Sequence, residues 1–506
     1  MTNSEKLLKV LGGNPNAYAT NYGVRKAILS ALGGNPESCS NINEVDLEIL
    51  RIYQSGGGGT GGTVVLETAN ITKNGTYVPS EGYNGFDKAI VNVLPVLETA
   101  NITKNGTYTP SSGFDGFGSV VVNVPADGGS FKVLNGMKFK GSTVLPESLD
   151  TYDVTDFKNM FSGCTKLTSI PQLNTSKGTD FTEMFSSCGG LTSIPQLDTS
   201  SGTTFNNMFY NCTKLTTIPE LDTSSGTDFN NMFYNCTKLT TIPQLDTSSG
   251  TNFEGMFCMC SGLTSIPQLD TSSGTTFNNM FYNCTKLTTI PELDTSSGTN
   301  FSTMFRSCNK LTSIPALDTS NSTNFTQMFD GCSSLTSIPP LSLGTGSVDY
   351  MFNGCSSLIS IPELDFSTAT SAQCMFQGCT NLTTVNHLDV SGVSSTYYMF
   401  YKCTNLTTVS LNISNIPHFT YIFEHCSNLQ NVNIVGSIDS SISFSYSPLL
   451  TYDSVKSILT ACSNTTTTTS KTLKFSTTHT DVDGELAALI AYCNTKGWTI
   501  SGLTLN

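Results

Sequence analysis

The chain has 506 residues, of which only 12% are charged, and it carries a formal net charge of −14. A chain of this length exceeds one compact core, so we expect several domains or a repeat array. Its 24 Lys and Arg residues form no cluster, which argues against nucleic acid or an anionic membrane as a partner, because both require a basic patch.

Residues 1–55 are predicted to be a helical segment for attachment or oligomerisation. Apolar residues recur there at helical spacing: Leu7, Leu8, Leu11, Val24, Ile28, Leu32, Val45, Leu47, Ile49 and Leu50. Leu-Gly-Gly-Asn-Pro stands at 11–15 and again at 32–36, where Gly and Pro favour the end of a helix. No apolar run is typical of a signal peptide or a membrane span, so we expect synthesis in a cytoplasm and no membrane insertion.

Residues 56–62, six of which are Gly, predict a flexible linker. Two tandem modules of 31 residues follow at 63–125, because Leu66–Tyr77 recurs unchanged at Leu97–Tyr108. Each copy contains Asn-Gly between residues that favour strands, which is a strong turn signal. We therefore expect two small β modules.

A unit of 24 residues repeats from 157 to about 434 and predicts a solenoid over 157–446, preceded by an N-terminal cap at 126–156. One unit has apolar residues at Phe205, Met208, Phe209, Cys212, Leu215, Ile218 and Leu221. The first four fall on one face of a short helical turn, and the last three fit a parallel β-strand. One unit buries too little apolar surface to fold alone, so the coils must stack.

Twelve of the seventeen cysteines occupy the same position of the repeat. They are Cys164, Cys188, Cys212, Cys236, Cys260, Cys284, Cys308, Cys332, Cys355, Cys379, Cys403 and Cys426. Parallel Cβ vectors in such a row oppose disulfide geometry, so buried free thiols are expected. Cys258 lies at a variable position, which predicts that it is exposed and the most reactive thiol. Residues 447–506 leave the period and predict an α/β cap, in which Trp498 closes the open end of the core.

The unit Met-Phe-x-x-Cys-x-x-Leu-Thr-Ser-Ile resembles the BspA-like class of leucine-rich repeats, found in bacterial surface proteins and in phages. This resemblance implies a leucine-rich-repeat-like solenoid, adhesion or host recognition, and no catalytic residues. Pro follows Ile in nine units, which departs from the commoner form of 23 residues. The Lys-Gly-Trp ending resembles the C-terminal cap of such proteins. The modules at 63–125 and the Leu-rich start resemble parts of phage head and tail fibres.

An aspartate ladder accompanies the repeat in the sequence Leu-Asp-Thr-Ser. Its members are Asp198, Asp222, Asp246, Asp270, Asp294 and Asp318. Stacked carboxylates repel one another, so each must cap a turn, be hydrated, or bind a cation such as Ca²⁺. Turn capping is the preferred interpretation, and no metal site is predicted.

Two positions vary while the frame of the repeat stays constant: the one after Met-Phe and the one after Ile-Pro. We expect ligand-binding residues there, since Tyr offers a large contact area at a small entropic cost. The candidates are Tyr210, Tyr234, Tyr282, Arg306, Tyr401, Gln196, Gln244 and Gln268. The alternative is that these exposed positions have simply drifted.

Nothing in the chain resembles a nucleophile elbow, a P-loop or a pair of acid and base carboxylates, so we expect neither an enzyme nor a cofactor. The sequence hypothesis is a phage head or tail fibre on the virion surface, made in the host cytoplasm. It predicts a homotrimer whose N-terminal segment binds a capsid or tail protein and whose solenoid binds a host surface glycan or protein. A bacterial surface adhesin and a purely structural virion decoration are the alternatives.

Overall fold

The computed structural model describes residues 130–506, apart from 143, 344, 365, 367, 414–420 and 466–468, together with four short strands nearer the N-terminus. β1 (Gly75–Tyr77) pairs antiparallel with β2 (Ala89–Val91) inside the first predicted module. β3 (Leu97–Ile102) and β4 (Gly116–Val122) form a second sheet of two strands. The helices predicted in 1–55 and the linker predicted at 56–62 lie outside the described residues.

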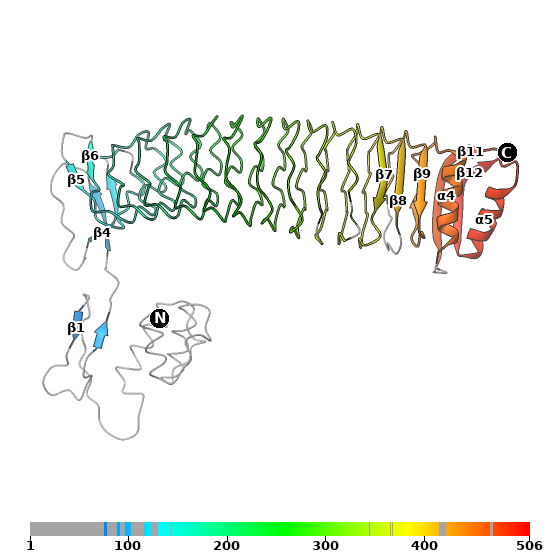
Figure 1. Cartoon of the computed structure of the whole chain (residues 1–506), viewed down its shortest axis with the longest axis horizontal. Helices are drawn as coiled ribbons and strands as arrows, with labels where there is room; N and C mark the ends of the chain where they lie inside the picture. The colour runs from blue at the N-terminus through cyan, green and yellow to red at the C-terminus, as the bar shows by residue number, and fades with distance from the viewer. Residues whose placement is uncertain are drawn as a thin grey trace, which may run out of the picture. The chain divides into compact units, whose positions relative to one another are not determined.

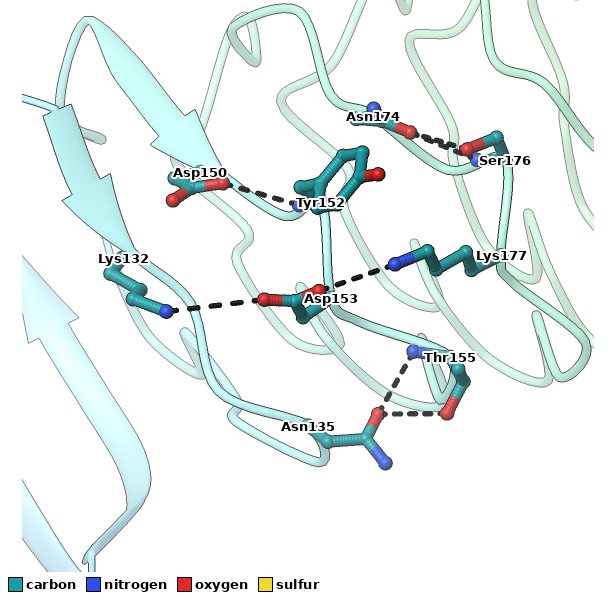
Figure 2. A network of polar contacts seen from close by, with 9 residues as sticks. All are labelled: Lys132, Asn135, Asp150, Tyr152, Asp153, Thr155, Asn174, Ser176 and Lys177. Atoms are coloured by element: carbon teal, nitrogen blue, oxygen red, sulfur yellow. Dashed lines mark hydrogen bonds and ion pairs between the residues drawn. The ribbon is translucent and has the colours of Figure 1, made fainter.

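The first coil of the solenoid rests on a cap in which β5 (Ser130–Lys132) pairs in parallel with β6 (Ser148–Asp150). Figure 2 shows the polar contacts that join this cap to the first coil. The Asn135 Oδ1 accepts from the backbone N–H groups of Thr155 and Asp156, at 3.1 and 2.8 Å. Asp153 lies 3.2 Å from the Lys177 ammonium in the next coil. These contacts replace the coil that would otherwise precede residue 157.

The coils stack along one axis from the cap to the C-terminal end of the solenoid (Figure 1). The short helical turn predicted in each coil is wrong, because the described part of 151–383 contains no helix. Two residues per coil have positive φ, such as Asn207 at 53° and Asn211 at 58°, and this breaks the segment into successive turns. The N–H groups of Phe205, Asn207, Phe209 and Asn211 donate to carbonyl oxygens of the next coil instead of closing helical bonds.

The strand predicted in each coil is present only in the last three coils. There β7 (Thr384–Asp389), β8 (Thr408–Asn412) and β9 (Asn431–Val435) form a parallel sheet, and earlier coils show only isolated bridges among the described residues. The strands begin where Asn386 replaces the Pro that follows Ile in the earlier coils. Proline has no N–H to donate to a ladder, so its loss permits continuous pairing.

Two rows of fully buried phenylalanines run through the stack, one from each Phe of the repeat. Phe205 lies 5.9 Å from Phe229 between ring centroids, and Phe209 lies 5.5 Å from Phe233, with nearly parallel planes. Gly226 sits against the first row, where an added Cβ would come within 2.8 Å of Phe229 and 2.9 Å of Phe205. The glycine of Ser-Gly-Thr is therefore required by the packing of the aromatic row.

The C-terminal cap alternates strands and helices: β10 (Ile442–Ser443), α4 (Tyr452–Ser463), β11 (Lys471–His479), α5 (Glu485–Thr495) and β12 (Trp498–Leu505). The three strands form a parallel sheet in the order β10-β11-β12. Trp498 is buried, and its indole N–H donates to the Cys462 carbonyl oxygen at 3.1 Å, so it closes this end of the core as predicted. In the part of the chain that is described, no helix has the length and apolar character to cross a membrane.

Candidate ligand-binding surface

The aspartate ladder caps turns. In each of its six members Oδ1 accepts two hydrogen bonds from the Ser two residues later; for Asp246 these come from the Ser248 N–H at 3.1 Å and the Ser248 hydroxyl at 2.6 Å. This is the Asx-turn geometry preferred among the three alternatives. The Ser248 hydroxyl holds the pKa of Asp246 below its usual value. No group of three or more His, Cys, Asp or Glu that could hold a metal occurs among the described residues.

The predicted glutamine candidates join neighbouring coils. The Gln196 Nε2 donates to the Glu220 carbonyl oxygen at 2.6 Å, and Gln244 and Gln268 make the same contact with the next coil at 2.6 Å. Their amide donors are thus engaged by backbone, although the side chains themselves are exposed. The sequence alone did not indicate this structural use. Because the amide nitrogens are engaged, only the amide oxygens of these glutamines are available to a ligand.

The residues after Met-Phe form a continuous row, which we call the variable row. It comprises Ser162, Ser186, Tyr210, Tyr234, Cys258, Tyr282, Arg306, Asp330, Asn353, Gln377, Tyr401 and Glu424. The rings of Tyr210 and Tyr234 stack with centroids 4.6 Å apart. The Arg306 guanidinium lies 5.6 Å from the centroid of the Tyr282 ring and 2.9 Å from the Asp330 carboxylate. The candidate tyrosines and Arg306 are half-buried, not fully exposed; Tyr210 contacts Tyr234, and Tyr282 contacts Arg306.

Cys258 corrects one expectation about this row. Its side chain is only 3% exposed, and burial raises the pKa of its thiol to about 12. A protonated and inaccessible thiol is a poor nucleophile, so the prediction that Cys258 is exposed and reactive is wrong. The small thiol occupies the row between Tyr234 and Tyr282, where the two neighbouring coils place large tyrosine side chains.

A second group of side chains, which we call the aromatic cluster, lies on the coils that contain β8 and β9 and on the segment just after β10. It consists of Tyr397, Tyr398, Tyr401, Tyr421, His425 and Tyr446. The rings of Tyr398 and Tyr421 stack 5.1 Å apart, and His425 lies 4.2 Å from Tyr446. Tyr397, Tyr421 and Tyr446 are between 37% and 44% exposed, which is unusual for contacting aromatic rings.

Only Tyr401 of the aromatic cluster was a candidate from the sequence. The signal that could have found the others is their place in the repeat. Tyr398, Tyr421 and His425 have φ of 55°, 61° and 64°, and they occupy the two left-handed positions that earlier coils often give to Asn. Asn and Gly adopt this conformation most readily, so large aromatic residues there require another reason.

Comparison with known families divides the solenoid into two parts. Residues 131–242 and 227–339 match the family described as Mycoplasma protein of unknown function, DUF285. Residues 348–474 match the BspA type leucine rich repeat region. The solenoid therefore has a leucine-rich-repeat fold, and residues 348–474 are similar to BspA type repeats. No curated protein sequence matches the chain.

Several solved structures resemble the chain at low identity. A leucine rich cell surface protein from Faecalibacterium prausnitzii is 22% identical, with coverage of 56% of this chain and 84% of that one and a TM-score of 0.29. A leucine-rich repeat protein from Bacteroides ovatus is 17% identical, with coverage of 73% and 91% and a TM-score of 0.33. The functional domain of InlJ from Listeria monocytogenes, which includes a cysteine ladder, is 16% identical, with coverage of 63% and 76% and a TM-score of 0.20.

Proposed function

We propose that this leucine-rich-repeat protein, in which residues 348–474 are similar to BspA type repeats, is a surface adhesion protein that binds its ligand along the solenoid. The observation that carries the proposal is the contrast between the core and the variable row. Phe, Met and Cys recur with little change inside each coil, whereas the variable row carries Tyr, Arg, Asp and Gln. The sequence similarity to BspA-type repeats supports adhesion over catalysis.

Binding on the variable row fits the physical character of its side chains. Tyr210 and Tyr234 are held in place by stacking, so little side-chain entropy is lost when a ligand contacts them. Tyr282 is similarly held against Arg306. Each coil contacts only its neighbours, so many weak contacts along the row add up when the ligand is itself repetitive.

The test replaces Tyr210, Tyr234 and Tyr282 together with Ser in the full chain. Fluorescently labelled wild type is expected to bind cells in a panel of epithelial and bacterial cells, and the triple variant to bind the same cells less. A variant with Ser225, Ser249 and Ser297 changed to Ala alters the same three coils at exposed Ser-Gly positions and is the control. The proposal is abandoned if the folded triple variant binds as well as wild type does.

The phage fibre is the second candidate, and the duplicated segment Leu66–Tyr77 favours it through the resemblance to fibre proteins described above. It predicts a homotrimer whose N-terminal segment binds a capsid or tail protein. Analytical ultracentrifugation of the full chain and binding of the labelled protein to bacterial instead of epithelial cells distinguish the two candidates. A monomer that binds epithelial cells alone would exclude the fibre.

A further inference from the structure

The aromatic cluster has ring faces that do not pack into the core. The buried rows of the solenoid are Phe, whereas the aromatic cluster consists of five Tyr and one His. Tyr397, Tyr421 and Tyr446 are exposed, and the other three side chains are half-buried. The Tyr401 ring meets His425 edge to face at 5.5 Å, and Tyr397 meets Tyr421 in the same way at 5.8 Å. The six rings therefore form one connected group that extends from the coils of β8 and β9, which Figure 1 locates, to Tyr446 after β10.

Mutual contact keeps these rings ordered before any ligand arrives. Tyr398 stacks on Tyr421 and also contacts Tyr397 and Tyr401 edge to face, at 4.2 and 4.8 Å. Such packing restricts the side-chain rotamers, so a ligand that stacks on the rings loses little of its binding free energy to ordering. An exposed group of aromatic rings with polar rims marks an interaction site more often than a solvated face.

The charges around the aromatic cluster select the kind of ligand. The Lys402 ammonium lies 5.1 Å from the centroid of the Tyr401 ring. Glu424 occupies the position of Tyr401 in the next coil, so one positive and one negative charge lie beside the cluster. Surfaces that stack nucleic-acid bases combine aromatic rings with a positively charged groove. This surface has no excess of cations among the described residues, and the whole chain has a net charge of −14. A neutral ligand is favoured.

We propose that the aromatic cluster is a platform for the ring face of a neutral saccharide. The C–H groups on one face of a pyranose carry partial positive charge and are attracted to the negative face of an aromatic ring, while its hydroxyls reach the phenol and charged groups at the rim. Aromatic rings on successive coils suit a polymer of repeating sugars. The proposal names the ligand class of the adhesion surface and in that sense rests on the proposed function.

The experiment measures binding of the full chain to an array of neutral and acidic oligosaccharides, with single-stranded oligothymidylate as the nucleic-acid probe. Wild type is expected to bind neutral glycans, and saturation-transfer NMR is expected to show transfer to their ring C–H protons. The double variant Tyr397→Ala and Tyr421→Ala is expected to lose about tenfold or more in affinity, as loss of a stacking ring does elsewhere. The double variant with Phe at both positions retains the rings and keeps most of the affinity.

Tyr152→Ala is the matched control, since Tyr152 is 59% exposed and belongs to the N-terminal cap. It is expected to leave glycan binding unchanged. Absence of binding to every neutral glycan, unchanged affinity in the Ala double variant, or preference for oligothymidylate would each overturn the saccharide platform. If wild type binds cells and no glycan, the saccharide platform is overturned and the adhesion proposal stands. If wild type binds neutral glycans and no cells, the saccharide platform stands and the adhesion proposal is overturned.

Discussion

The thiol of Cys188 donates to the carbonyl oxygen of Phe161, 3.0 Å away in the preceding coil. That oxygen also accepts from the backbone N–H of Cys164 at 3.1 Å. All twelve repeat cysteines make the equivalent bond, including Cys426 to Phe400 at 3.1 Å. Cysteine thus fills core volume and supplies a weak donor to a buried carbonyl oxygen of the preceding coil, a combination that Ala and Val lack.

Replacement of one repeat cysteine in the middle of the stack tests this role. Cys236 is fully buried and donates to the Phe209 carbonyl oxygen at 3.1 Å. Cys236→Ala is expected to reduce the free energy of unfolding by about 1–2 kcal/mol, through the cavity and the lost donor. Urea denaturation followed by circular dichroism measures the change. Ser225→Ala on the surface of the preceding coil is the control and should have no measurable effect.

Thiol labelling of the native protein checks the burial of the cysteines. All sixteen cysteines among the described residues are buried, Cys258 included. At neutral pH, a maleimide is expected to leave these sixteen unmodified until denaturant is added, and then to modify them together. Mass spectrometry of the peptides identifies the modified sites. Rapid labelling of Cys258 in the folded protein would contradict its placement in the variable row.

Alkaline pH is expected to destabilise the solenoid. Burial raises the pKa of the thiols of Cys212, Cys260 and Cys308 from 9.0 to about 12. The unfolded chain loses these protons from pH 9 upward and the folded chain does not, so the stabilisation is complete below pH 9 and is lost as the pH rises toward 12. Each thiol contributes a slope of about 1.4 kcal/mol per pH unit in that window.

The decline of the free energy of unfolding with pH is measured from urea denaturation midpoints between about pH 8 and pH 10, in the presence of a reductant. Cys212→Ala should show a shallower decline than wild type, by the contribution of one thiol. An equal decline in both proteins would assign the effect to other titrating groups, such as the tyrosines.

The glycine beside the aromatic row offers a sharper test of packing. Gly226→Ala places a Cβ 2.8 Å from Phe229, 2.9 Å from Phe205 and 2.9 Å from the Thr223 carbonyl oxygen. This overpacking is expected to cost about 1–3 kcal/mol in the free energy of unfolding. Gly189→Ala is the control, because an added Cβ there has no neighbour closer than 3.4 Å. The melting temperature of Gly189→Ala should stay near that of wild type.

The aspartate ladder is expected to act through turn capping and not through a cation. Asp246→Ala removes both bonds to Ser248 and should cost about 0.5–1 kcal/mol, the usual range for a lost cap at an exposed site. Because the pKa of Asp246 is lowered, this stabilisation is present above the carboxyl's ordinary pKa and is lost as the pH falls through the folded value. Chelation with EDTA should not change the melting temperature, whereas a calcium ladder would lower it.

The sequence by itself determined the period of the repeat and the buried rows. Those follow from the spacing of Phe, Met, Cys and Leu, because a unit that recurs in the same register must bury the same positions in every coil. The aspartate caps could also be predicted, since Asp-Thr-Ser brings its own hydrogen-bond partner two residues later in the chain.

Only the tertiary structure decided the backbone conformation of each coil and which side chains come together on its surface. The spacing of Phe205, Met208, Phe209 and Cys212 fits both a helical turn and a series of tighter turns. The choice depends on hydrogen bonds to the next coil, which sequence spacing does not specify. The aromatic cluster escaped prediction for the same reason. Tyr397 and Tyr421 lie one coil apart in the chain, and stacking of the coils alone brings their rings together.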